Sequence, residues 1–149
     1  MLRSLIGLFD TARADACSTS RFERRQLQAA VAVLLHEARR ADYAEGDAEY
    51  AAARQALVEI FGLDRSQSDA LLEQGRARAP QLTSLYAPLA VIKREFSLEE
   101  RILLVEHLWR VAYAEGGLDR YEDHYVRKIA HLLYIPNTQS MLARNRARR

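Results

Sequence analysis

Two stretches of the sequence repeat one pattern: VAVLLHEARRAD at residues 31–42 and LVEHLWRVAYAE at residues 104–115. At a constant offset of 73 residues, the apolar residues Val31, Leu35, Ala38 and Ala41 align with the apolar residues Leu104, Leu108, Val111 and Ala114, and Asp42 aligns with Glu115. Both stretches space their apolar residues as one face of an amphipathic helix does. Because a recurring pattern of this length is one supersecondary unit used twice, we predict two related helix–loop–helix halves on one core.

The repeat continues beyond the end of the first helix in each copy. At the same offset Glu49 aligns with Glu122, and Ile60 aligns with Leu133. Each copy therefore carries an acid where its first helix ends and a second acid seven residues later. The matched loops are the places where we look for chemistry.

Length and composition indicate one globular domain. The chain has 149 residues, of which 49% are hydrophobic and 28% are charged, and its formal net charge is +2. The single Cys17 can form no internal disulfide, which suits a reducing compartment. No apolar run is long enough to span a bilayer, and no signal-peptide cleavage site follows the apolar start. We therefore expect a cytoplasmic protein.

Periodicity and capping signals predict an all-α fold of seven to eight helices. We expect helices over residues 22–41, 47–61, 66–78, 83–94, 97–114 and 119–134, and a short helix after Pro136. Ser66 with Asp69, and Ser97 with Glu100, have the spacing of capping boxes. Pro88 either lies in the first turns of its helix or kinks it.

The chain divides into three parts. Residues 1–20 are predicted to be a short amphipathic helix followed by a polar linker, residues 21–143 the helical domain, and residues 144–149 a frayed basic tail. The apolar residues with helical spacing at the start are Leu2, Leu5, Ile6 and Phe9. Membrane or partner contact by this start, and lipid or nucleic-acid contact by the tail, are the less favoured alternatives.

Acidic residues are concentrated in the two matched loops. The candidate metal ligands are Asp42, Glu45, Glu49, Glu115, Asp119 and Glu122. Asp42 and Glu115 lie at helix C-termini, where the dipole is already negative, so a carboxylate there costs roughly 0.3–1 kcal/mol. A divalent cation would reverse this sign, because carboxylate and carbonyl oxygens together form a hard-ligand site.

A purely structural role stays open for these acids. Glu49 and Glu122 stand at third helical positions, where glutamate commonly completes a cap, and the loops can be solvated acidic turns. The EF-hand pattern is absent. The four histidines lack the HExxH and Cys/His ligand spacings, and Cys17 has no activating neighbour in sequence. Neither a zinc enzyme nor a nucleophilic enzyme is indicated.

The second half carries a family resemblance. Residues 96–109 read FSLEERILLVEHLW, and residues 112–133 read AYAEGGLDRYEDHYVRKIAHLL. With the matching acids of the first half, the chain resembles the TerB-like, tellurite-resistance family over about residues 22–147. This family also occurs in the N-terminal region of membrane-anchored DnaJ-like co-chaperones.

The family pattern is Ala-Asp-Gly followed by an acid about seven residues after the Asp. It maps onto Ala41, Asp42 and Glu49, and onto Ala114, Glu115, Gly116 and Glu122. Tyr43 replaces the glycine of the first copy, and Glu115 replaces the aspartate of the second. The resemblance implies an all-helical fold whose acidic residues bind a divalent metal.

Together these features predict a non-enzymatic TerB-like module that binds Ca²⁺, Mg²⁺, Mn²⁺ or Zn²⁺ weakly through its two acidic loops. It would act as a scaffold or sensor with protein partners in a stress-response assembly. One possible location of this assembly is the surface of the inner membrane. Nucleic acid is not expected. The alternative is a metal-independent protein-interaction domain whose acidic loops recognise a basic partner.

Overall fold

A computed structural model of the chain describes residues 2–39, 47–114, 116, 118 and 120–148. Within these residues all regular structure is helical, which confirms the all-α prediction. The elements are α1 (Leu2–Ala38), α2 (Asp47–Phe61), α3 (Arg65–Arg78), the 3₁₀ turn η1 (Ala79–Gln81), α4 (Tyr86–Glu95), α5 (Leu98–Tyr113), α6 (Arg120–Leu132) and α7 (Asn137–Ala147). None of the described helices is both long and apolar enough to cross a membrane.

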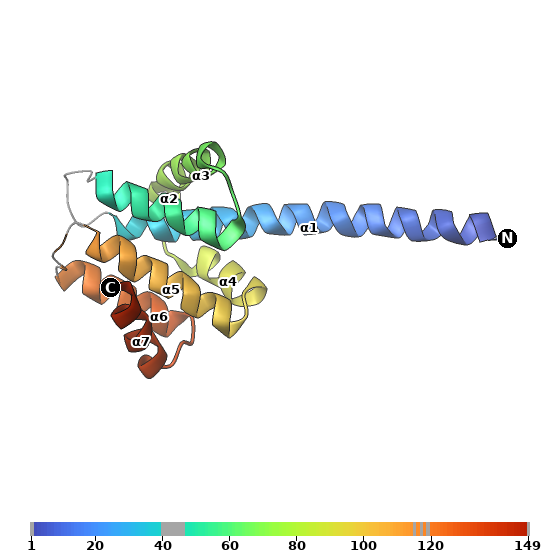
Figure 1. The fold of residues 1–149 in the computed structure, drawn as a ribbon. Helices are drawn as coiled ribbons and strands as arrows, with labels where there is room; N and C mark the ends of the chain where they lie inside the picture. Colours follow the sequence, from blue (N-terminus) through green and yellow to red (C-terminus); the bar gives the residue numbers. More distant parts are fainter. Residues whose placement is uncertain (1, 40–46, 115, 117, 119, 149) are drawn as a thin grey trace.

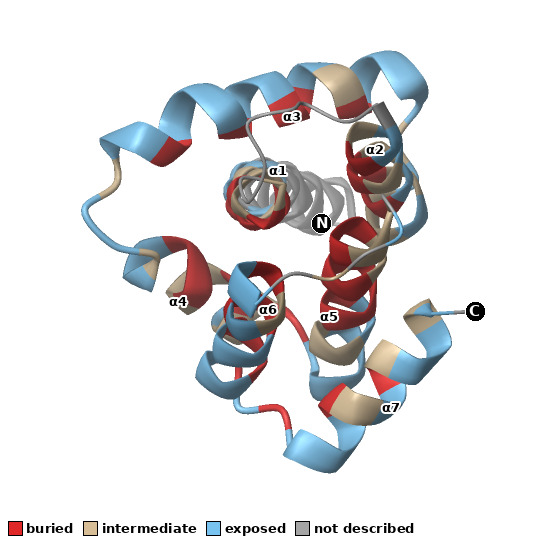
Figure 2. Ribbon diagram, turned by 90° about the vertical axis from the view of Figure 1, so that its left-hand side faces the viewer, coloured by how far each residue is buried: buried red, intermediate tan, exposed pale blue. Residues whose placement is uncertain are grey.

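The long helix α1 is the axis of the molecule. Its C-terminal part is surrounded by the other helices (Figure 2), whereas its N-terminal part projects away from them (Figure 1). The predicted linker at residues 10–20 is therefore wrong, because these residues continue α1. They contain no glycine or proline, so nothing in their backbone chemistry ends the helix.

The core forms where the repeated helices meet. Val31 and Leu35 on α1, and their equivalents Leu104 and Leu108 on α5, are all fully buried. The second helices also begin at equivalent residues, α2 at Asp47 and α6 at Arg120. Each buried leucine stabilises the fold by roughly 1.5–3 kcal/mol. The residues that match in the sequence repeat therefore occupy matching positions in the core.

Glycine at position 75 lets α3 approach α1 closely. A Cβ atom added there would lie 2.7 Å from the carbonyl oxygen of Ala32, which is backbone and cannot move aside. Leu71 and Leu72 on the same helix are also buried.

Helix starts agree with the sequence where a local cap encodes them. Ser97 and Glu100 form the predicted capping box of α5, with bonds of 3.0 and 3.2 Å. For α3 the predicted cap Ser66 is wrong: Asp64 caps the helix and exchanges bonds with Gln67. Aspartate caps as well as serine does, and Asp64 is the residue whose backbone is extended.

Pro88 lies in the first turn of α4, because this helix begins at Tyr86 rather than at residue 83. Its missing N–H is not needed there, so the first of the two predicted alternatives holds and no kink is required.

Residues 144–147 continue α7, so the predicted frayed tail does not begin at residue 144. α7 continues through Ala147, and Arg146 Nε donates to Glu106 Oε1 at 2.8 Å. The Arg144 guanidinium lies 6.0 Å from the Trp109 ring centroid. The sequence shows only a run of arginines there, because their acceptor and aromatic neighbour lie on the distant α5.

Among the described residues, left-handed backbone follows three helices, and Gly116, with φ of +94°, is the one after α5. Gly62 follows α2 with φ of +67°, as its sequence position predicts, and Tyr134 follows α6 with φ of +57°. At the end of α6 the Ile135 N–H donates to the Ala130 carbonyl at 3.0 Å, which closes a Schellman motif. A non-glycine residue in this conformation costs about 1–2 kcal/mol.

Candidate functional site

Glu49 and Glu122 occupy equivalent buried positions. Each is the third residue of its helix, α2 or α6, and their exposures are 2% and 4%. The positive end of the helix dipole favours a carboxylate there, and both side chains have interaction partners. Such support is required, because burying an unpaired charge is costly. The two glutamates are thus part of the packed body.

The helix ends that border the two acidic segments in sequence lie at one end of the molecule. Figure 1 shows the C-terminal ends of α1 and α5 and the N-terminal ends of α2 and α6 on the same side. The other four candidate ligands, Asp42, Glu45, Glu115 and Asp119, lie outside the described residues. Within residues that the structure does describe, no group of three or more His, Cys, Asp or Glu side chains is placed to hold a metal ion.

Tyr125 fixes the start of α6 against α1. Its hydroxyl donates to the carbonyl oxygen of Leu34 at 2.8 Å. Burial raises the pKa of Tyr125 well above the usual 10, and the nearby Glu37 and Tyr121 raise it further. The phenol therefore stays a neutral donor and holds the helix that carries Glu122 in a fixed position.

A polar cluster beside Glu49 joins α2 to α3. Asp69 accepts from the Tyr50 hydroxyl at 2.8 Å and from Arg54 Nε at 2.7 Å. The bond from Arg54, followed by that from Tyr50, lowers the pKa of the Asp69 carboxyl. The Arg39 guanidinium lies 4.8 Å from the Tyr50 ring centroid. Asp69, predicted as a capping partner, instead connects two helices.

A second polar cluster, around His107, joins α2 to α5. The imidazole is 1% exposed, and its Nε2 lies 3.0 Å from Glu59 Oε2 without the alignment of a hydrogen bond. Burial lowers the pKa of His107, and the opposing effect of the Glu59 carboxylate is smaller. The Glu59 pKa is lowered too, first by the bond from Gln55. A neutral histidine thus faces an ionised glutamate, whose cationic partner is Arg110 at 3.3 Å.

The clusters around Asp69 and His107 were missed in the sequence. Their members come from different helices, so no spacing rule connects them. One local signal was available: Glu106 and Arg110 have the i, i+4 spacing of a helical ion pair, and they lie 3.8 Å apart.

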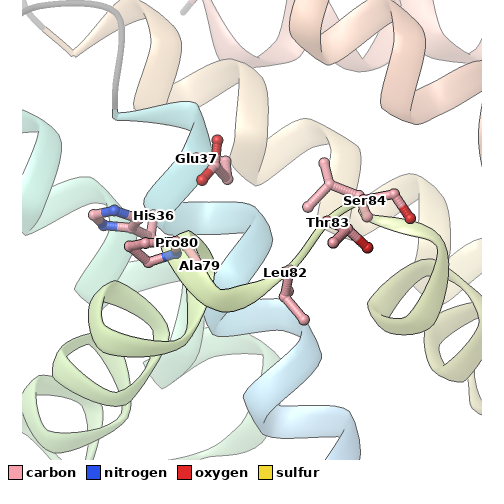
Figure 3. A pocket seen from close by; sticks show the side chains of 8 residues that line it. His36, Glu37, Ala79, Pro80, Leu82, Thr83 and Ser84 are labelled. Carbon is pink, nitrogen blue, oxygen red and sulfur yellow. The ribbon is translucent and has the colours of Figure 1, made fainter.

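A pocket of about 540 Å³ lies beside the last turn of α1. Its polar residues include His36 and Glu37 from α1 and Thr83 and Ser84 from the segment before α4, and Pro80 and Leu82 add apolar surface. Figure 3 shows the His36 and Glu37 side chains pointing in different directions. They therefore do not converge as an acid–base pair would.

Comparison with known proteins places the chain in a family. The family model described as tellurite resistance protein TerB matches residues 28–145. A crystal structure of a protein of unknown function from Porphyromonas gingivalis W83 aligns with a TM-score of 0.60 and 22% identity, over 84% of this chain and 89% of that one. At this identity the likeness shows the fold alone. No curated protein matches the chain. Because the matched residues span most of the sequence and both acidic segments, the chain belongs to the TerB family.

Proposed function

We propose that this TerB-family chain is a non-enzymatic cytoplasmic module that binds a divalent cation weakly through its two acidic segments. It would act as a scaffold or sensor for protein partners in a tellurite-type stress response. The observation that carries the proposal is the matched pair Glu49 and Glu122, buried at equivalent helix starts.

The chemistry of the available donors suits a hard cation. Carboxylate oxygens favour Ca²⁺, Mg²⁺ and Mn²⁺. The described part of the chain supplies two such groups, and the remaining ligands would come from Asp42, Glu45, Glu115 and Asp119. The role of the protein would be to keep these acids together, so that the cation offsets their mutual repulsion.

Thermal unfolding in EDTA and in millimolar Ca²⁺, Mg²⁺, Mn²⁺ or Zn²⁺ tests the proposal. A cation that binds only the folded state should stabilise it by roughly 2.7 kcal/mol at a hundredfold excess over Kd. The double variant Asp42→Asn, Glu115→Gln should lose most of this gain. Glu99→Gln, which neutralises an acid in the first turn of α5, is the control and should keep it.

The alternative is a metal-independent interaction domain whose acidic segments bind a basic partner. It is supported by the charge of the first acidic segment, where Asp42, Glu45, Asp47 and Glu49 have no basic residue among them. If none of the four ions changes the melting temperature, the metal proposal is rejected and this alternative is favoured.

A further inference from the structure

The exposed face of α6 carries an excess of positive charge. Its exposed residues include Arg120, Tyr121, His124, Arg127, Lys128 and His131. The acid of this helix face, Asp123, is paired with Arg127 at 2.8 Å. Among the described residues, Arg120 and Lys128 have no ion-pair partner. By comparison, exposed Arg76 has a close acid, Glu73, at 2.6 Å.

Tyr134 lies where this face ends, and it provides an independent observation. Its side chain is 73% exposed although its backbone is left-handed, with φ of +57°. The Lys93 ammonium group lies 4.8 Å from its ring centroid, which connects α4 to the same surface. The Schellman motif that ends α6 accounts for this backbone, and it leaves the exposed aromatic ring beside the α6 face.

We propose that this α6 face, formed by Arg120, Tyr121, His124, Lys128, His131 and Tyr134, binds an acidic segment of a partner protein. Arg120 and Lys128 supply charge complementary to glutamate and aspartate. Tyr121, 50% exposed, and Tyr134 supply aromatic surface of the kind enriched in protein interfaces. Figure 2 shows that the outer side of α6 is exposed, with α1 and α5 on its inner side.

Charge favours a protein partner over a phosphate polymer or a membrane. Nucleic-acid and anionic-lipid surfaces are generally bound by larger groups of cations, often four to eight for lipid. The α6 face offers two cations without an ion-pair partner among the described residues. The chain has a net charge of only +2, and acidic Glu115 and Asp119 precede α6 in sequence. A short acidic peptide segment requires fewer contacts.

Fluorescence anisotropy with a short labelled peptide of alternating glutamate and leucine tests the proposal. Measurements at low salt in EDTA keep the outcome separate from the metal proposal. Lys128→Glu should weaken binding about tenfold, since it reverses a charge at the centre of the face. The matched control is Arg65→Glu on α3, which lies across α1 from α6 (Figure 2) and changes the net charge equally. It should weaken binding less than about twofold.

A second variant separates binding from folding. Tyr134→Gly suits the left-handed backbone, so the melting temperature should not fall, while loss of the ring should weaken peptide binding severalfold. No peptide binding by the wild type, or equal effects of Lys128→Glu and Arg65→Glu, would overturn the proposal. Tighter binding to duplex DNA or to phosphatidylserine vesicles than to the peptide would show that the partner is a nucleic acid or a membrane and not an acidic protein segment. Self-association abolished by Lys128→Glu would make the occupant a second copy of the chain.

Discussion

The buried imidazole of His107 makes the stability of the fold depend on pH. Burial lowers its pKa below the usual 6.5, so the folded chain holds the neutral form. Well above pH 6.5 the folded and unfolded chains bind equal numbers of protons at this residue. As the pH falls through this value, the unfolded chain takes up a proton first, which favours unfolding.

We therefore expect the free energy of unfolding to fall between about pH 8 and pH 5.5, by about 1.4 kcal/mol for each unit of pKa difference. Urea titrations across this range measure it. His107→Leu should flatten the dependence, and leucine already fills the equivalent buried position, Leu34. An equal pH dependence in both proteins would contradict this assignment.

At the scale of the helix, an ion pair between Arg146 of α7 and the buried Glu106 of α5 holds the two helices together. Glu106 is 7% exposed, and its short contact is Arg146, at 2.8 Å. Arg110 lies farther away, at 3.8 Å. Removing Arg146 would leave the carboxylate with its weaker neighbour, although partial exposure of the arginine moderates the cost.

Arg146→Ala should lower the free energy of unfolding by about 1–2 kcal/mol, measured by urea denaturation. Arg148→Ala is the control, because that side chain is exposed and lies 5.8 Å from the Tyr113 ring centroid. A double-mutant cycle with Glu106→Gln isolates the pair, since removing the charge should lower the cost of removing the arginine. A loss as small as that of the control would show that α7 is held by its apolar residues.

Elements were predictable where their determinants lie within a few residues. The box at Ser97 and the left-handed Gly62 mark helix ends that the structure confirms. The linker prediction was wrong because no glycine or proline between residues 10 and 20 ends the helix. The prediction that fraying begins at residue 144 was wrong because Arg146 bonds to Glu106, which is distant in sequence. Similarly, the repeat identifies Glu49 and Glu122 as a matched pair but does not predict that both are buried. A glutamate at the third position of a helix can equally well be an exposed capping residue.

At the scale of the whole molecule, the repeat accounts for the body but not for the projecting half of α1. Matched apolar positions, such as Leu35 and Leu108, predict the shared core because both lie on the inner faces of their helices. The region before the repeat has no counterpart at the same offset. It continues the same helix without a glycine or proline between residues 10 and 20, so its direction follows from the helix to which it is joined.

The projecting half of α1 should therefore be dispensable for folding. Residues 20–26 are exposed, the buried part of α1 begins at Ala30, and the family match begins at residue 28. A chain that starts at Ser20 should have a free energy of unfolding within about 0.5 kcal/mol of that of the full chain, because this part of α1 projects away from the other helices (Figure 1). Thermal and urea unfolding measure the difference. A chain that starts at Ala30 is the contrast: it loses Leu27, which packs on the core, and Arg24, which donates to the Phe61 carbonyl at 3.1 Å. If the shorter deletion already lowered the melting temperature markedly, the projecting helix would have to pack in solution, on the body or on a second copy.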